Sequence, residues 1–233
     1  MKSLISVLLL FFVTQAVCQT MTGSELLSKS IAYHDPGSNW PTFNGKLIVS
    51  METPDSPNRV SEIEINLPAE YFSVFMTKGD EKISYSVEKG RCTTCVYGAS
   101  VNKDPNEKPC EKAKLYKNYY TYLYGLPMKL TDPGTKIHEK VGRKKFKGKE
   151  YLVLKVTYEE AVGKDVWFYY FDPNTYAMEI YQFYKGDPKK EGKNTGEYIL
   201  LTEEAIVNGI NMPKNRAWFY NKDDTYLGTD RLQ

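Results

Sequence analysis

Three cysteines are the residues of this sequence whose types and spacing could do chemistry. Cys92 and Cys95 form a C-x-x-C pair, and Cys110 follows after a polar segment. Redox-active dithiols and pairs of zinc-binding cysteines both have this spacing. A redox pair lies at the start of a helix, whereas the segment 96–98 favours a strand or a turn. The sequence therefore argues against redox catalysis at this pair.

A structural disulfide is the chemistry that these cysteines favour. A zinc site would need a fourth ligand, and neither His34 nor His138 has a spacing to the cysteines that supports one. Disulfides are the default for cysteines of exported proteins. We expect Cys110 to pair with either Cys92 or Cys95, and the closed loop to be worth about 3 kcal/mol.

The two histidines suit structural roles. His34 ends a predicted helix, where an imidazole can bond free carbonyl groups. Its alternative role is that of a general base beside Asp35. His138 lies in the polar segment 136–140 and is expected to be exposed. The sequence has no nucleophile elbow, zinc-protease motif, phosphate loop or calcium loop, so it predicts no catalytic residue, no metal site and no cofactor, and favours a non-enzymatic protein.

The charge of the chain is close to balanced. Its formal net charge is +2 over 233 residues, which offers no electrostatic case for binding nucleic acid or an anionic membrane surface. The densest basic run, residues 143–149, precedes a strand-like segment and is predicted to be a solvated turn.

The stretch 112–134 predicts an aromatic helix in the middle of the chain. Apolar residues recur at spacings of three and four, and Gly125 followed by Pro127 is a helix-ending signal. Additional tyrosines widen the apolar surface beyond one core-facing stripe. We therefore expect this helix to lie between a core and a second apolar surface, either as simple core packing or as the lid of a cavity. The apolar positions are Leu115, Tyr116, Tyr119, Leu123 and Leu126, and the additional tyrosines are Tyr120, Tyr122 and Tyr124.

The N-terminus has the pattern of a signal peptide. Lys2 precedes the apolar run 4–13, which is too short to span a bilayer. Ala16 and Cys18 are small residues that suit cleavage before Gln19, with lipidation of Cys18 as the alternative. Either route exports the protein. We expect a leader over residues 1–18, a single domain over residues 19–233, and no transmembrane segment in the rest of the chain.

The remaining sequence predicts an N-terminal helix and an antiparallel sheet. Thr22 and Glu25 form a capping box, and Pro36 disfavours continuation of the helix past His34. From Phe43 onward the apolar period changes to two, and the connections are too short for crossovers. Strands are expected at 47–51, 63–67, 71–77, 82–87, 151–158, 165–171, 176–184, 197–203 and 216–220, and residues 92–110 are expected to form a loop.

Several stretches resemble a family of small exported proteins of the Bacteroidota whose function is not established. The most specific part is the pattern GLPMKL-DPG, and the resemblance covers residues 22–230. The family supplies no catalytic residues. The stretches that carry the resemblance are residues 33–36, Trp40, 65–68, 119–130, 132–134, 196–200, 212–214 and 226–230.

The order of elements also resembles the lipoprotein carriers of the periplasm. The FDP-T turn at residues 171–175 and the segment 197–213 carry this looser resemblance. It implies a mainly β fold, a curved antiparallel half-barrel with an N-terminal helix and a central helix on its concave face. It also implies an apolar ligand in the groove. The Cys92–Cys110 segment and the lack of a matching arginine depart from the carrier pattern.

These observations favour a periplasmic or outer-membrane-associated protein that binds a lipid or another apolar molecule. A structural or protein-interaction module of the envelope with a filled core, whose partner is another envelope protein, is the alternative. A hydrolase using His34 and Asp35 is a lesser one. From the pattern, the expected cavity wall consists of Tyr119, Tyr122, Leu123, Met128, Trp167, Tyr169, Tyr181 and Phe183.

Overall fold

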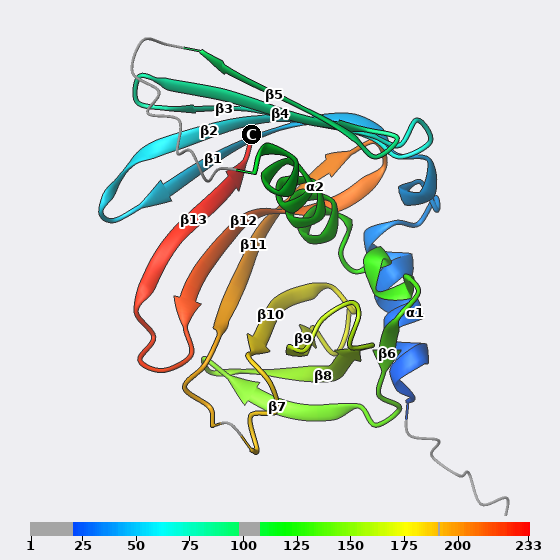
Figure 1. Ribbon diagram of the computed structural model, residues 1–233. Helices are drawn as coiled ribbons and strands as arrows, with labels where there is room; N and C mark the ends of the chain where they lie inside the picture. Colours follow the sequence, from blue (N-terminus) through cyan, green and yellow to red (C-terminus); the bar gives the residue numbers. More distant parts are fainter. Residues whose placement is uncertain (1–20, 98–107, 191) are drawn as a thin grey trace, which may run out of the picture.

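The computed structural model describes residues 21–97, 108–190 and 192–233 (Figure 1). The expected leader and Cys18 lie outside the described residues. Among those described, no helix combines the length and the apolar composition that a membrane crossing requires. The helical elements are α1 (Gly23–His34), η1 (Trp40–Thr42), α2 (Pro109–Gly125) and η2 (Met128–Thr131).

The strands of the described part of the chain form one antiparallel sheet. The sheet order is β5-β4-β3-β2-β1-β13-β12-β11-β10-β9-β8-β6, with β7 paired to β8. The sheet curves strongly and stays open, so that α2 lies inside the curve (Figure 1). The predicted half-barrel is therefore confirmed. The strand bounds are β1 Asn44–Thr53, β2 Ser56–Asn66, β3 Tyr71–Lys78, β4 Glu81–Glu88, β5 Arg91–Tyr97, β6 Thr135–Ile137, β7 Gly142–Phe146, β8 Lys149–Tyr158, β9 Val166–Phe171, β10 Met178–Tyr184, β11 Glu197–Val207, β12 Ile210–Tyr220 and β13 Tyr226–Leu232.

Helix α1 begins and ends where the sequence predicts. The amide of Glu25 donates to Thr22 Oγ1 at 3.2 Å, and the amide of Thr22 donates to Glu25 Oε2 at 2.8 Å. Both bonds of the capping box are present, so two orphan amides of the first turn are satisfied. Leu26 and Leu27 are buried, which anchors the helix to the end of the curved sheet.

Helix α2 ends at Gly125 as predicted, but Gly125 has a role other than the predicted one. Gly125 does not have a positive φ, so it is not a left-handed cap. A Cβ atom there would lie 2.2 Å from Cζ2 of Trp40, so close packing against that indole is what requires glycine. Leu115, which the helical period placed on the apolar face, is 64% exposed, whereas Tyr120 and Tyr124 are buried.

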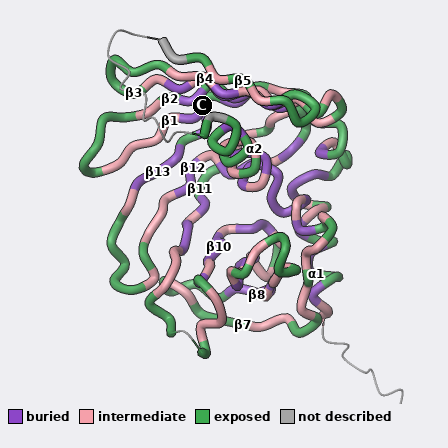
Figure 2. Tube along the Cα trace, in the orientation of Figure 1, coloured by how far each residue is buried: buried purple, intermediate pink, exposed green. Residues whose placement is uncertain are grey.

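The core lies along the inside of the curve (Figure 2). Strands β1 and β2 alternate as predicted, with Leu47, Val49, Ile63 and Ile65 buried against α2 and the rest of the core. Residues 168–171 were expected to be covered on their second side by a helix or a ligand. Instead, Tyr170 packs on the outer face in a small cluster with Phe146 of β7 and its neighbours.

Four segments differ from the predicted strands. Cys92 and Cys95 lie in β5 and not in a loop, because β5 pairs with β4 along its whole length. The basic run 143–149 is a β-hairpin, with β7 and β8 flanking a turn at Lys147 and Gly148, rather than a solvated turn alone. Strands β6 and β13 carry too few apolar residues to be recognised from periodicity.

The disulfide joins Cys92 of β5 to Cys110 of α2, and Cys95 is a free, exposed thiol. Of the two partners that the sequence leaves open for Cys110, Cys92 is therefore the one that forms the bond. The bond ties the first turn of α2 to an edge strand of the sheet, beside the helix face that packs on β4 and β5.

Candidate functional site

A cavity of about 550 Å³ opens on the concave face between α2 and the strands β8, β9, β10 and β12. Its volume falls in the range of about 300–1,000 Å³ that is usual for small-molecule sites. The lining surface is mainly apolar, and the inward-facing positions of these strands contribute large rings to it. The aromatic residues that line the cavity are Tyr119, Tyr122, Tyr158, Trp167, Phe183 and Trp218.

Trp167 and Phe183 form the sheet side of the cavity. They are directly opposite each other in the pairing of β9 with β10, so both point to the same face of the sheet. Their rings lie 4.8 Å apart between centroids, with an interplanar angle of 25°. Tyr122 of α2 meets the Trp167 ring edge-on at 5.8 Å. The helix and the sheet thus each contribute an aromatic surface to one cavity.

Three tyrosine hydroxyl groups meet at the base of the cavity. Tyr122 Oη hydrogen bonds to Tyr158 Oη, and lies 2.5 Å from Tyr169 Oη. Tyr158 Oη and Tyr169 Oη are 3.3 Å apart. Burial raises the pKa of all three phenols, so they stay neutral at physiological pH. The trio ties α2 to β8 and β9 and leaves little hydrogen-bonding capacity for a ligand.

The charged residues that line the cavity are partly exposed and lie at its mouth. Lys129 of η2 forms an ion pair with Asp132, and both side chains line the cavity. Asp165 also lines it, and partial burial raises the pKa of this carboxyl group. An apolar interior with a few charged groups at the mouth suits an amphiphile with its polar end outward.

The expected wall residues divide into two groups. Tyr119, Tyr122, Leu123, Trp167 and Phe183 line the cavity. By contrast, three others are packed in the core and do not line it: Met128, Tyr169 and Tyr181, of which the two tyrosines have no exposed surface.

Sequence reasoning missed several residues of this site. Trp218 of β12 and Tyr158 of β8 complete the aromatic walls. The alternation of apolar residues predicts both strands. The same alternation places Trp218 on the inward face of its strand, so this residue could have been predicted. Lys129, Asp132 and Asp165 at the mouth have no sequence signal, because their grouping depends on how η2 and the β8–β9 connection meet.

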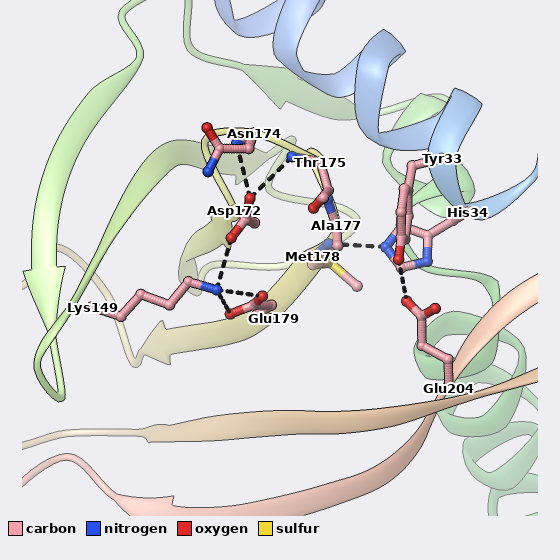
Figure 3. A network of polar contacts seen from close by, with 10 residues as sticks. All are labelled: Tyr33, His34, Lys149, Asp172, Asn174, Thr175, Ala177, Met178, Glu179 and Glu204. Atoms are coloured by element: carbon pink, nitrogen blue, oxygen red, sulfur yellow. Dashed lines mark hydrogen bonds and ion pairs between the residues drawn. The ribbon is translucent and has the colours of Figure 1, made fainter.

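His34 and Asp35 are structural residues away from this cavity. The His34 Nδ1–H group donates to the Asn211 carbonyl oxygen at 2.7 Å. Its Nε2 atom accepts from the Met178 amide at 2.9 Å (Figure 3). Burial lowers the pKa of His34, which is only 1% exposed, so the ring is neutral. Asp35 accepts bonds from the amides of Asn39 and Trp40. His34 thus bonds strand groups rather than the carbonyl groups of its own helix.

The turn after β9 is held by charge and hydrogen bonds. Asp172 accepts bonds from the amides of Asn174 and Thr175 at 2.8 and 3.0 Å, and Lys149 lies between Asp172 and Glu179 (Figure 3). The hydrogen bond from Lys149 is the main cause that lowers the pKa of Asp172 to about 2. The FDP-T segment is therefore a structural turn that joins β9 to β10.

His138 is more enclosed than expected. Its Nε2 atom lies 3.1 Å from Thr157 Oγ1, and partial burial lowers its pKa. No group of three or more histidine, cysteine or acidic side chains that could hold a metal ion occurs in the described ranges.

Two solved structures align with most of this chain. A LolA superfamily protein from Nitrosomonas europaea aligns over 92% of both chains with a TM-score of 0.52 and 10% sequence identity. A DUF1329 family protein from Desulfovibrio piger aligns over 92% of both chains with a TM-score of 0.47 and 7% identity. The first likeness shows a LolA-like fold, as the predicted resemblance to the carriers implied.

Sequence comparison assigns the family. A search of curated proteins finds no match to this sequence. A family model matches residues 2–232, which is nearly the whole chain. The chain therefore belongs to the family of unknown function DUF6503.

Proposed function

We propose that this protein binds a lipid or a similar apolar molecule in the concave cavity, without catalysing a reaction on it. The observation that carries the proposal is the cavity of about 550 Å³ between α2 and the sheet, whose lining surface is mainly apolar with six aromatic rings, and whose charged lining residues are partly exposed. Burying alkyl surface against such walls is favourable at about 25 cal/mol per Å² of apolar area removed from water.

The position of the cavity supports this function. It lies on the inside of an open half-barrel, where α2 forms one wall and the sheet forms the other. The likeness of the fold to a LolA superfamily protein agrees with a role as a carrier. The apolar run at residues 4–13 agrees with export, so we place the ligand in the cell envelope.

The alternative is a structural or interaction module of the envelope. The observation that favours it is the dense packing beneath the cavity, where Tyr169 and Tyr181 have no exposed surface and the three tyrosine hydroxyls bond to one another. A hydrolase is not favoured, because both ring nitrogens of His34 are engaged in bonds to backbone groups.

Native mass spectrometry of the protein purified from the envelope tests the proposal. A carrier is expected to show a reproducible additional mass in the lipid range that organic extraction removes. A clean apo mass, together with no change of melting temperature on addition of lipids, would refute the proposal and leave the interaction module.

Two neighbouring residues of β9 provide a matched pair of variants. Trp167 faces the cavity, and Phe168 faces the opposite side of the sheet. Trp167→Ala is expected to reduce the retained lipid mass strongly, whereas Phe168→Ala is expected to retain it. Equal loss in both variants would mean that destabilisation, and not the cavity, explains the result.

A further inference from the structure

The concave groove continues beyond the main cavity into a second one. The second cavity has a volume of about 200 Å³ and lies on the strands β1, β11, β12 and β13. The two cavities share two lining residues, Tyr119 of α2 and Trp218 of β12. The second cavity is lined by Met51, Tyr119, Glu197, Trp218, Leu227 and Gly228.

One pair of rings therefore separates the two cavities. The rings of Tyr119 and Trp218 lie nearly parallel, with an interplanar angle of 18° and a centroid distance of 6.3 Å. Tyr119 comes from the helix and Trp218 from the sheet, so a small displacement of α2 from the sheet would part them.

A single carboxylate oxygen holds both rings. Tyr119 Oη and Trp218 Nε1 each donate to Asp230 Oδ2 at 3.2 Å. Asp230 is 2% exposed, and its other oxygen, Oδ1, has no hydrogen-bond partner among the described residues. Burial raises the pKa of this carboxyl group, against the opposing effect of Arg216 and Arg59. The polar contacts that hold the pair together are thus two long hydrogen bonds to one atom, and Tyr120 and Tyr181 pack edge-on against the two rings.

The chemistry of the second cavity matches an alkyl chain. Met51 and Leu227 provide apolar side chains, and Gly228 contributes backbone to the lining. Glu197 contributes a carboxylate, whose pKa is raised by burial. A chain that passes from the main cavity would meet this apolar surface directly behind Trp218.

We propose that the second cavity extends the ligand site and takes the distal end of a long, unbranched amphiphile when Tyr119 and Trp218 part. This inference rests on the proposed function, because the ligand enters through the main cavity. Its polar end stays at the mouth beside Lys129 and Asp132, and its length spans both cavities.

Chain-length dependence tests the extension. Primary alcohols from 1-octanol to 1-hexadecanol are titrated against the purified full protein, with displacement of 1-anilinonaphthalene-8-sulfonate as the signal. Each methylene that enters an apolar site raises affinity about fourfold. Leu227→Trp fills the second cavity, and Met51→Trp fills it from a different strand. Ile206→Trp, at a position that is 75% exposed, controls for the added indole.

Affinity is expected to rise with chain length in all four proteins. In the wild type and in Ile206→Trp the rise should continue to longer alcohols than it does in either filling variant. The ratio of long-chain to short-chain affinity then falls by about fourfold for each excluded methylene. The same ratio in all four proteins, with the filling variants folded by circular dichroism, would overturn the extension while leaving the main cavity as the ligand site. Failure of every alcohol to bind would overturn both the proposed function and the extension.

Discussion

Replacing His34 with alanine is expected to destabilise the protein and to flatten its dependence on pH. The imidazole bonds the carbonyl of Asn211 in β12 and the amide of Met178 at the start of β10, and it is 1% exposed. His34 therefore joins the C-terminus of α1 to two strands at once. The alanine variant would leave one buried carbonyl and one buried amide without a partner, beside a cavity the size of the lost ring.

The magnitude follows from these losses. Each buried polar group without a partner costs about 1–3 kcal/mol, and the cavity adds to this, so we expect a loss of about 3–5 kcal/mol in the free energy of unfolding. For a domain of this size, each kcal/mol lowers the melting temperature by about 2–4 °C. The variant should therefore melt roughly 6–20 °C below the wild type.

The sign of the pH effect follows from the lowered pKa. Burial lowers the pKa of His34 in the folded protein, whereas in the unfolded chain it is about 6.5. Below about pH 6.5 the unfolded chain binds a proton that the folded protein does not bind. The contribution of His34 is therefore complete above about pH 6.5 and is lost as the pH falls toward the folded pKa, with a slope of at most about 1.4 kcal/mol per pH unit.

Urea unfolding between about pH 8 and pH 5.5 measures both effects. His138→Ala is the matched control, because partial burial lowers the pKa of His138 as well but its ring makes one bond, to Thr157 Oγ1. His34→Ala should show the larger loss at pH 8 and the shallower decline below pH 6.5. A loss below about 1 kcal/mol, or a decline as steep as that of the wild type, would refute the structural role assigned to His34.

Three further variants, with Cys95→Ser as the control for the first, test the supports of the helices by thermal unfolding. Cys110→Ser should lower the free energy of unfolding by about 3 kcal/mol, and reductant should have the same effect on the wild type, whereas Cys95→Ser should change little because its thiol is free and exposed. Gly125→Ala should destabilise by more than 1 kcal/mol even though alanine favours helix, since its Cβ would lie 2.2 Å from the Trp40 ring; a stabilised variant would contradict that packing. Thr22→Ala should cost about 1 kcal/mol through loss of the capping box, and an unchanged melting temperature would contradict it.

The sheet could be predicted where one face of a strand is buried. Strands such as β2 alternate apolar and charged residues, so period and element agree. Strand β13 reads Tyr226–Leu232 without a clear alternation, because Thr229 and Asp230 are buried through their hydrogen bonds rather than through apolar contact. Burial by hydrogen bonding leaves no hydrophobic period in the sequence, so this strand was missed.

The choice of disulfide partner shows what a correct strand assignment adds. Cys92 and Cys95 are three residues apart, so in a strand they point to opposite faces of the sheet. Cys110 lies on the concave side with α2, and one of the two thiols can reach it. In a loop, Cys92 and Cys95 would not be forced to opposite faces, so a loop prediction for residues 92–110 cannot decide which of them bonds Cys110.

The sequence predicts which side chains point to the concave face of the sheet, but not which of them line the cavity and which are buried beneath it. Trp167, Tyr169, Tyr181 and Phe183 all point to the concave face, as their parity implies. Two neighbouring cross-strand pairs on this face have different environments. Trp167 and Phe183 line the cavity, whereas Tyr169 and Tyr181, the next pair along the strands, are buried beneath it. Depth depends on where α2 crosses the strands, and nothing in a strand's own sequence records that crossing.

The excess of tyrosine on α2 has a physical explanation in the curvature of the sheet. A helix inside a half-barrel meets strands on more than one side, so a single apolar stripe is not enough. Tyr120 Oη donates to Ser61 Oγ of β2 at 3.0 Å, Tyr119 Oη donates to Asp230 of β13, and Tyr122 bonds Tyr158 of β8. Tyrosine suits each position, because its ring packs in the core while its hydroxyl bonds a strand on that side. The tyrosines that give α2 more apolar surface than one core-facing stripe needs therefore let the helix bridge both halves of the sheet. The two cavities lie beside this helix.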